Sequence, residues 1–447
     1  MKITINNFKS IHELRDFDFL PLNVLAGVNS GGKSSLTQIL LLLKQTLEAD
    51  TSEGLSLEGR YINIPTLTDF VYGKSKTENI GIALTLYKKE ITNSHEIEQS
   101  FPWLGELDSV SIKFAFHTNG SVKCHSLALN IMAANVNHYI TLDIIATGKD
   151  KGKYKLNSSN ADFFGIQDAN STSFKAVIPT FQGLFPTFIE TGNADAPILN
   201  LTIMKMVKAA LNNWFSNLQY IGPTRVSPMP IVSYTSANFK DVGTDGQHTR
   251  FILHQKQNEV LENGKTLLAE VKRWICDEMK LAQDLSVIRD GTNSYRIRLT
   301  DNRGEKVELY QVGFGVSQVL PIIVQGLLTP RGGMFVVDAP EVHMHPSVQG
   351  TLLDFFAEMS RNNRSALIET HSDHMVIRTR RRLAEQIISP ENVNLCYVTN
   401  GDKGSEFRTI AIDSSGNIRS SLPIGFLDAL DEDFRSIVQA KLRSKHE

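Results

Sequence analysis

The sequence has 447 residues, a formal net charge of −2, 41% hydrophobic residues and 21% charged residues. This length corresponds to two or three domains, and the composition suits a large core surrounded by water. Because the net charge is close to zero, no overall field attracts nucleic acid or membrane, so such a contact requires a local patch. Three widely spaced cysteines and the lack of a long apolar run argue against a disulfide framework, a zinc site and a membrane span. We therefore expect a cytoplasmic protein.

Hydrophobic periodicity predicts three kinds of region along the chain. The first begins with strands at residues 2–8 and 22–26 and a helix at about 33–47. Short alternating segments then predict an antiparallel β region between about 55 and 198, with strands at residues 80–87, 110–117, 126–131 and 139–145. The next elements are a helix (201–218), a short strand (220–223), a mostly helical stretch (246–281) and a hairpin (285–309).

The last region alternates helices with short apolar strands, which is typical of a parallel α/β sheet. We expect helices at residues 317–328, 347–360 and 373–386, and strands at residues 334–337 and 366–368.

A phosphate-binding motif lies between the strand at 22–26 and the helix that follows it. Residues 27–34 read GVNSGGKS, which matches G-x-x-x-x-G-K-[ST] without a gap. Glycines let backbone N–H groups surround a phosphate at a helix N-terminus, the lysine reaches the β- and γ-phosphates, and Ser34 ligates Mg²⁺. A glycine-rich turn without a ligand is the alternative, which the flanking strand and helix disfavour. The predicted nucleotide-binding residues here are Gly27, Asn29, Ser30, Gly31, Gly32, Lys33, Ser34 and Ser35.

Asp338 ends the apolar strand MFVVD, so a buried parallel strand brings its carboxylate to the sheet edge. A carboxylate in that place holds Mg²⁺ directly or through water. The alternative is an ordinary buried strand with a solvated acid at its end.

Two further segments are weaker signals. Residues 313–318 (GFGVSQ) open a helix, where a glycine-flanked serine makes a second anion site, although such a spelling alone is more often a turn. His371 follows another apolar strand and is predicted to lie near the γ-phosphate, the alternative being a structural histidine.

The order of these motifs resembles the ABC-type ATPases of the SMC, recombination-repair and OLD-like superfamily. More narrowly, residues 338–346 (DAPEVHMHP), 220–225 (YIGPTR) and 369–372 (ETHS) resemble the AAA-15-type ATPases. Residues 413–416 (DSSG) and 422–428 (LPIGFLD) resemble the tail of the members with a DUF3696-type ending. Many relatives are ATPase subunits of bacterial anti-phage systems of the Septu, retron-associated and PARIS-like kinds.

The resemblance implies an α/β fold, an ABC-type P-loop ATPase head over residues 1–447 with an antiparallel β subdomain and a helical insertion. Its expected parts are an N-terminal lobe with the phosphate loop (1–90), a β-rich insertion (91–215), a helical and hairpin region (216–310) and a C-terminal lobe with the signature, the Walker B acid and the His switch (311–447).

The resemblance also implies a homodimer or larger homo-oligomer with ATP and Mg²⁺ as cofactors. ATP would lie between the phosphate loop of one subunit and Gly315, Ser317 and Gln318 of another. Asp338 would serve Mg²⁺ and His371 would sense the γ-phosphate.

One position departs from the family pattern. The residue after the Mg²⁺ acid is usually a glutamate that orients the attacking water, and here it is Ala339. Loss of a general base typically costs roughly 10²- to 10⁴-fold in rate. Glu341 is the candidate substitute, and otherwise hydrolysis is very slow.

Effector chemistry is not expected in this chain itself. The one Asp-x-Asp spelling, at residues 431–433, is predicted to lie on a solvated helix rather than at the end of a strand in a nuclease. We expect a separate effector nuclease of the HNH or TOPRIM type, with nucleic acid or a phage component as a possible trigger and no membrane contact. A basic run, Arg378, Arg380, Arg381 and Arg382, can contact nucleic-acid phosphates or pair with acids, and both readings stay open.

Three hypotheses result. The first is an ATP-dependent switch subunit that controls a separate nuclease in a defence complex. The second is a repair-type ATPase that acts directly on DNA. The third is a scaffold that holds ATP with little turnover.

Overall fold

The computed structural model describes residues 1–49, 54–74, 79–91, 107–116, 124–144, 154–159, 175–182, 184–191, 199–200, 202–230, 232–234, 239–291 and 294–420. The chain divides into two compact units that interleave along the sequence. Unit 1 comprises Met1–Phe19, Ser34–Ser216 and Asn400–Glu406, and unit 2 comprises Leu20–Lys33, Asn217–Thr399 and Phe407–Glu447. The predicted tail motif at 422–428 and the acidic segment at 431–433 lie outside the described residues.

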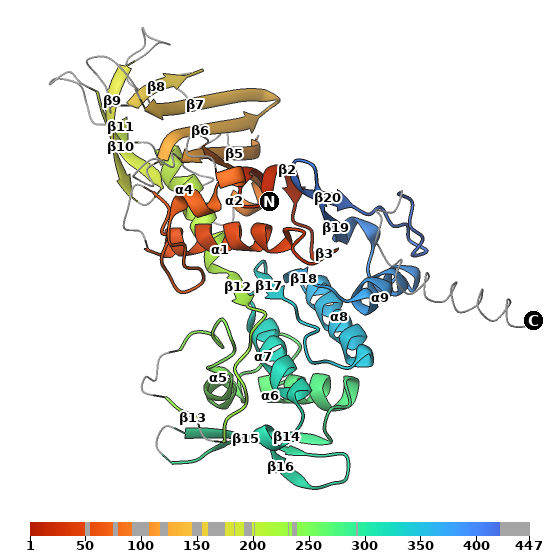
Figure 1. The fold of residues 1–447 in the computed structure, drawn as a ribbon. Coiled ribbons are helices and arrows are strands. Elements are labelled where there is room, and N and C mark those ends of the chain that lie inside the picture. The colour runs from red at the N-terminus through yellow and green to blue at the C-terminus, as the bar shows by residue number, and fades with distance from the viewer. Residues whose placement is uncertain are drawn as a thin grey trace, which may run out of the picture. The chain divides into compact units, whose positions relative to one another are not determined.

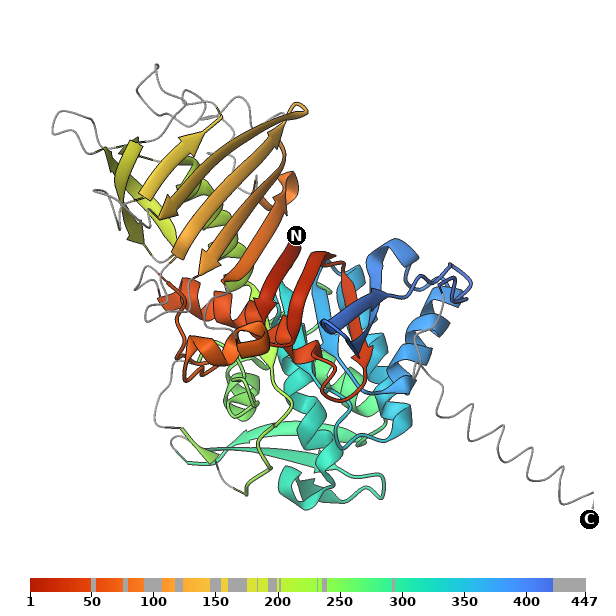
Figure 2. The same cartoon turned by 45° about the horizontal axis from the view of Figure 1, so that its top comes forward.

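Unit 1 is built on an antiparallel sheet with the strand order β11-β10-β9-β8-β7-β6-β5-β4-β1-β2. Figure 2 shows β5, β6 and β7 side by side as long, twisted strands. In β5 the side chains of Val110, Ile112, Phe114 and Phe116 are buried on one face, as the period of two in a strand requires. The strands are β1 (Lys2–Phe8), β2 (Ile11–Asp18), β4 (Ile80–Tyr87), β5 (Leu107–Phe116), β6 (Cys124–Ala133), β7 (Val136–Ile144), β8 (Tyr154–Ser158), β9 (Lys175–Gln182), β10 (Phe185–Thr191) and β11 (Leu199–Asn200).

Helices of unit 1 cover this sheet. The longest are α1 (Lys33–Ala49), whose first residue ends the first segment of unit 2, and α4 (Thr202–Ser216), which packs on β10. The Lys44 ammonium of α1 donates a hydrogen bond to the backbone oxygen of Phe215 (2.7 Å) and so ties the two helices together. The short helices are η1 (Leu67–Phe70), η2 (Tyr72–Lys74) and α2 (Lys88–Ile91).

Unit 2 contains a parallel sheet with the order β19-β3-β18-β17-β12. Its strands are β3 (Leu22–Gly27), β12 (Leu218–Ile221), β17 (Met334–Asp338), β18 (Ser365–Glu369) and β19 (Val393–Gly401). Three helices connect or precede these strands and lie beside them in Figure 1: α7 (Phe314–Leu328), α8 (Pro346–Arg361) and α9 (Asp373–Ala384). Leu218, which we expected to end a helix, instead begins β12.

A second, antiparallel sheet of unit 2 follows the order β13-β15-β14, with β16 also paired to β15. Helix α5 packs on this sheet, and a π-helical turn, η4, continues α6. The mostly helical stretch and the hairpin predicted at 246–281 and 285–309 are therefore confirmed. The elements of this part are β13 (Val232–Ser233), β14 (Asp284–Arg289), β15 (Ser294–Thr300), β16 (Lys306–Glu308), α5 (Thr249–Lys256), α6 (Leu267–Lys272), η4 (Arg273–Glu278) and η5 (Leu309–Gln311). Outside it, η6 (Pro390–Asn392) precedes β19, and β20 (Gly404–Thr409) pairs with β2 at Gly404.

One hydrophobic core holds unit 2 together. It joins the apolar strands β3, β17 and β18 to helices α5 to α9, with Phe335, Phe355, Phe356 and Trp274 almost fully buried. This core takes the side chains of one face of these strands, such as Val337, while alternate residues such as Val336 and Leu367 are buried as well. Strands buried on both faces read as continuous apolar runs. The predicted α/β class with an antiparallel β region is confirmed. Among the described residues, no helix combines the length and apolar character needed to cross a membrane.

Candidate functional site

Three of the predicted motifs emerge at one edge of the parallel sheet of unit 2. Strand β18 lies between β3 and β17, and Glu369 at its end is in register with Leu25 on one side and Asp338 on the other. The strands are parallel, so all three end in the same direction. Loops at the carboxyl ends of parallel strands form the usual binding crevice of open α/β sheets.

The loop after β3 has a backbone that demands glycine at its first position. Gly27 has a φ of 147°, and a Cβ placed there would lie 2.1 Å from the backbone oxygen of Val398 in β19. Ser30 and Gly32 also have positive φ values, 58° and 98°. Asn29 and Ser30 are exposed, and the Gly31 N–H donates to the oxygen of Val28 (3.2 Å). This tightly wound loop is of the kind that cradles phosphate with backbone N–H groups.

Lys33 folds back over the loop. Its side chain is almost completely buried, and Nζ donates to the backbone oxygens of Gly27 (2.9 Å) and Val28 (2.8 Å). Nζ also lies 3.5 Å from Nδ1 of His371. Burial lowers the pKa of Lys33, against the opposing effect of the nearby acids, led by Glu369. The cation is thus placed at the loop, as predicted, and is satisfied by the carbonyl groups of the loop itself.

Asp338 stands at the end of β17 with its side chain partly buried. Burial raises the pKa of its carboxyl to about 6, while Arg225 and Lys33 act in the opposite direction and Glu341 adds to the rise. An anion in this position is costly without a cation, so the site favours a bound positive charge. This is the environment expected of a Mg²⁺ ligand.

Glu341 links the turn after β17 to the segment after β18. One carboxylate oxygen accepts a hydrogen bond from the His371 backbone N–H (2.7 Å), and the other accepts the Thr370 hydroxyl (2.8 Å). Thr370 is fully buried, and its own N–H donates to the backbone oxygen of Leu25 (2.9 Å). Glu341 was predicted as a substitute base, and in this structure it clamps the His371 segment with both oxygens.

His371 itself lies beside the phosphate loop. Burial lowers the pKa of its imidazole, and the neighbouring Lys33 cation lowers it further, with Glu341 opposing. The neutral form is therefore favoured, in which one ring nitrogen donates a hydrogen bond and the other accepts one.

The signature segment lies on α7, whose N-cap is Gly313 and whose first residue is Phe314. Ser317 is buried, and its hydroxyl donates to the Phe314 oxygen (2.7 Å). Gln318 is buried as well, whereas Gly315 is only partly exposed. Within the described residues, neither Ser317 nor Gln318 has a hydrogen bond to the phosphate loop, Asp338 or His371, so their role in a site shared between subunits stays a prediction.

Ser34 and Ser35 follow Lys33 in the first turn of α1 and belong to unit 1. The Ser35 hydroxyl is 2.8 Å from the Ser10 hydroxyl, so it is engaged within unit 1.

The residues present fit a magnesium–nucleotide ligand. The Gly27 backbone leaves no room for a side chain, Lys33 supplies a desolvated cation, and the partly buried Asp338 carboxyl favours a positive neighbour. Among the described residues no group of three or more His, Cys, Asp or Glu side chains could hold a metal ion.

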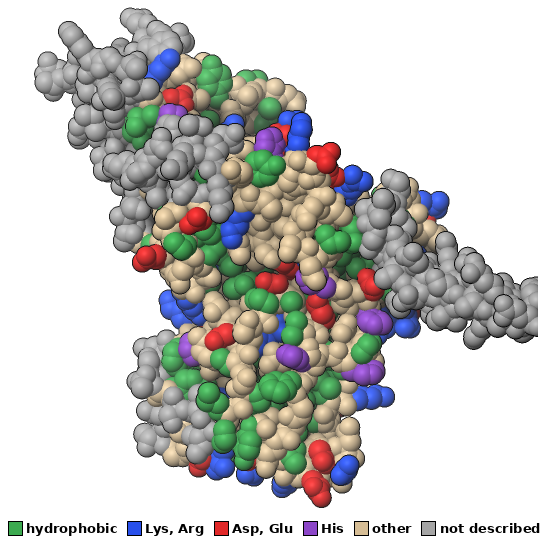
Figure 3. Space-filling model, in the orientation of Figure 1, with side chains coloured by type: hydrophobic (Ala, Val, Ile, Leu, Met, Phe, Trp, Pro, Cys, Tyr) green, Lys and Arg blue, Asp and Glu red, His purple; other side chains and the backbone are tan. Residues whose placement is uncertain are grey.

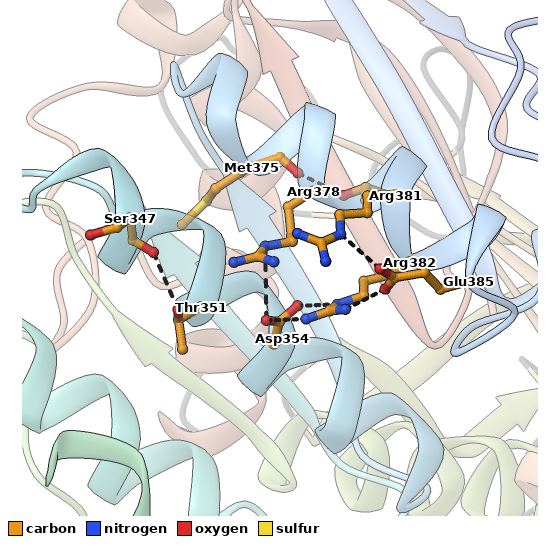
Figure 4. Close-up of polar contacts among 9 residues, drawn as sticks. Ser347, Thr351, Asp354, Met375, Arg378, Arg381, Arg382 and Glu385 are labelled. Carbon is orange, nitrogen blue, oxygen red and sulfur yellow. Dashed lines mark hydrogen bonds and ion pairs between the residues drawn. The ribbon is translucent and has the colours of Figure 1, made fainter. Parts of the chain in front are cut away.

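Three arginines of the basic run on α9 are paired with acids of their own unit, as Figure 4 shows, whereas Arg380 donates to the backbone oxygen of Gly416 (3.0 Å). Arg382 makes two contacts of 2.6 Å with the Asp354 carboxylate of α8, and Arg378 lies 3.8 Å from it. Arg381 and Arg382 also contact Glu385. The structure therefore favours acid pairing, within the chain rather than across an interface. On the face drawn in Figure 3, the described Lys and Arg side chains are scattered among acids rather than gathered in one patch.

Sequence reasoning assigned no role to Arg225 or Thr370, although both lie in segments it singled out. Arg225 is 5% exposed and donates from Nη2 to the backbone oxygens of Asp338 (2.9 Å) and Ala339 (3.1 Å). The sequence did show an arginine at the end of the segment 220–225, but it did not show which groups that arginine contacts.

Comparison with known proteins agrees with part of this assignment. Residues 193–376 match the family model described as AAA ATPase domain, which is less than half of the chain. No curated protein matches the sequence.

Similar solved structures include the Smc head bound to the C-winged helix domain of ScpA (11% identity, TM-score 0.47, 93% of this chain and 98% of that chain). Others are the SMC head domain from Thermotoga maritima (10%, 0.41, 92% and 98%) and the Smc head with an extended coiled coil bound to the C-terminal domain of ScpA from Pyrococcus furiosus (12%, 0.44, 92% and 96%). The family match contains Ser317, Asp338, Glu341 and His371 and supports an ATPase domain in this part of the chain.

Proposed function

We propose that this chain is an ATP-binding switch subunit whose ATP turnover is slow. The observation that carries the proposal is the meeting of Lys33, Asp338, Glu341 and His371 at the ends of β3, β17 and β18. In this proposal residues 27–34 bind phosphate, Asp338 binds the metal, and His371 lies between Lys33 and Glu341. Together these groups can distinguish a triphosphate from a diphosphate.

Each residue has a defined task in this proposal. Lys33 would exchange its contacts with Gly27 and Val28 for phosphate oxygens, and Asp338 would hold Mg²⁺. The metal, when bound, neutralises phosphate charge and orients the chain of phosphates. His371 would contact the γ-phosphate, and a movement of His371 would alter the hydrogen bond from its backbone N–H to Glu341. The phosphate signal therefore reaches the turn after β17 through one hydrogen bond.

We further propose that the switch works as a homodimer or larger homo-oligomer and controls a separate effector nuclease of the HNH or TOPRIM type. Support comes from the motif order and from the segments at 220–225, 338–346 and 369–372, which resemble AAA-15-type ATPases, a group with many members in defence systems. Gly315, Ser317 and Gln318 would complete the nucleotide site of a second subunit. A nucleic acid or a phage component would act as the trigger.

A scaffold that holds ATP with little turnover is a second candidate. Ala339 cannot polarise water, and both oxygens of Glu341 are occupied by Thr370 and His371. Direct DNA processing receives less support, because Arg378, Arg381 and Arg382 are paired with Asp354 and Glu385.

The test is nucleotide binding by Lys33→Ala, with Lys272→Ala as a control for removing a lysine of the same unit that pairs with Asp284. Affinity for a fluorescent ATP analogue with Mg²⁺ is measured by anisotropy, and phosphate release is measured in parallel. Lys33→Ala should weaken binding by about 100-fold, roughly 2.7 kcal/mol, and Lys272→Ala should not. Equal affinity of Lys33→Ala and the wild type would disprove the nucleotide site.

The switch and scaffold candidates differ in phosphate release and in partner binding. A switch releases phosphate above background and holds its effector in one nucleotide state only. Affinity purification of the chain from its native host, with ATP or ADP in the buffer, followed by mass spectrometry, measures the second property. Identical partner recovery in both nucleotides contradicts the switch.

A further inference from the structure

Arg225 lies beneath the turn that carries Asp338, and its side chain is more than nine-tenths buried. It follows β12, the strand next to β17 in the parallel sheet. One of its nitrogens, Nη2, donates to two consecutive backbone oxygens, those of Asp338 and Ala339. A single buried cation therefore holds the peptide that directly follows the predicted metal ligand.

The turn held by Arg225 has an unfavourable backbone. Ala339 has a φ of 44°, a left-handed conformation that residues with a Cβ adopt rarely. Its N–H donates to the backbone oxygen of Glu369 (2.8 Å), so the turn is also tied to β18. Strained backbone of this kind persists only where its surroundings hold it, and it collects at functional sites. Arg225 supplies two of the contacts that hold it.

The rest of the guanidinium is not used by the protein. Nε and Nη1 of Arg225 are buried and have no hydrogen-bond partner among the described residues. Burial lowers the pKa of Arg225, and the negative charges of Glu341 and Asp338 oppose that shift. Buried donors without partners are costly and rare, so their retention at this place points to a task in the site.

We infer that Arg225 is a positioning residue of the nucleotide site, which holds the turn at 338–341 so that Asp338 faces Mg²⁺ and Glu341 reaches Thr370 and His371. The inference rests on the proposed function. It assigns Arg225 an effect on metal-dependent nucleotide binding and leaves the contacts of the phosphate loop to Lys33. Residues that support a metal ligand from behind typically change metal affinity by about 10- to 100-fold when replaced.

The experiment compares Arg225→Gln and Arg225→Lys in the full chain, with Arg364→Gln as the matched control. Arg364 is also a largely buried arginine that donates to a backbone oxygen, that of Thr329 (2.6 Å), but it precedes β18 at the end opposite to Glu369. Affinity for a fluorescent ATP analogue is measured once with Mg²⁺ and once with EDTA, and circular dichroism confirms folding.

Without Mg²⁺, Arg225→Gln should bind the nucleotide with an affinity within about threefold of the wild type. The increase in affinity on adding Mg²⁺ should be about tenfold smaller in Arg225→Gln than in the wild type. Arg225→Lys, which keeps the charge and can still donate to one carbonyl, should recover part of that gain, and Arg364→Gln should keep all of it. A full Mg²⁺ gain in Arg225→Gln overturns the inference. Equal losses with and without Mg²⁺ also overturn it, because they indicate general damage to the fold. If the wild type binds no nucleotide under either condition, the proposed function fails and the inference fails with it.

Discussion

The carboxylate of Glu341 accepts the backbone N–H of His371 at 2.7 Å, so the residue two places after Ala339 grips the predicted γ-phosphate sensor. The Thr370 hydroxyl completes the grip on the second oxygen. A side chain held in this way has a structural role. It can orient water only after the segment at 370–371 moves or its hydrogen bonds rearrange.

Glu341→Gln separates these two tasks. Glutamine keeps one accepting oxygen but loses the charge, so the clamp should weaken by about 1 kcal/mol, seen as a small fall in Tm. If Glu341 also orients water, phosphate release should fall by roughly 10²-fold or more while nucleotide affinity changes little. Unchanged phosphate release together with a lower Tm would leave Glu341 as a clamp only.

Gly27→Ala tests the shape of the phosphate loop. The added Cβ would lie 2.1 Å from the backbone oxygen of Val398 at a φ of 147°, so β3 and β19 must separate locally. We expect a loss of about 3 kcal/mol in urea unfolding and loss of nucleotide binding. The control is Gly264→Ala, where φ is 78° and no atom lies within 4 Å of the added Cβ. It carries the backbone strain alone, so comparable losses in both variants would refute the steric explanation.

Asp338 gives the stability of the protein a predictable pH dependence. Burial raises the pKa of Asp338 to about 6, above the ordinary value near 3.9, so folding favours the protonated form. The stability contributed by that proton is complete below about pH 4 and is lost as the pH rises through about 6. Asparagine has no ionisable carboxyl, so the stability of Asp338→Asn should not change in this way. Between about pH 4.5 and 7 its free energy of unfolding should rise relative to that of the wild type, by up to roughly 3 kcal/mol. Urea unfolding without Mg²⁺ at both pH values measures this, and a constant difference between the two proteins contradicts it.

Asp354 holds two arginines of α9 against α8. Removing its charge in Asp354→Asn leaves the largely buried Arg382 with its remaining partner Glu385, so we expect a loss of about 2 kcal/mol in unfolding free energy. Glu385→Gln removes the exposed partner of the same arginine and should cost less. DNA binding at low salt should stay undetectable in the wild type, because these arginines are already paired. Tight DNA binding by the wild type would revive the DNA-processing hypothesis.

Apolar runs and glycine motifs made much of the fold predictable. The run MFVV correctly predicted a strand that ends in an acid. A strand buried on both faces is apolar at every position, so a short continuous apolar run identifies it. The tight turn at residues 27–34 was predictable for a similar reason, since its glycines are set by local backbone geometry.

Elements shaped by irregular pairing escaped prediction. Strand β2 buries Ile11, Leu14 and Phe17, a spacing of three that does not resemble a strand. The cause is a register shift in its pairing with β1, next to Asp16, whose φ is 48°. Helix α7 begins three residues before the expected Ser317, because glycines at 313 and 315 obscured the start.

The site contacts of Glu341, Arg225 and the α9 arginines depend on tertiary neighbours. Glu341 reaches Thr370 because β17 and β18 are adjacent and end in register, and Ala339 turns the chain with a positive φ. Arg225 meets the same turn because β12 lies next to β17. No spacing along the chain reveals these pairings, which is why the role of Arg225 was missed and the arginine run stayed ambiguous.

The hydrogen bonds that Lys33 makes within its own loop set a minimum binding free energy for a ligand of that loop. Its ammonium already donates to Gly27 and Val28, and hydrogen bonds of a charged donor are worth about 1.5–3 kcal/mol each. The contacts of a ligand with Lys33 must be worth at least that much free energy before the ligand displaces the two carbonyl groups. A free phosphate ion makes few contacts and competes poorly, whereas a nucleotide triphosphate engages the whole loop at once. The resting loop would therefore stay closed in a phosphate-rich solution and open only to a ligand of sufficient size and charge.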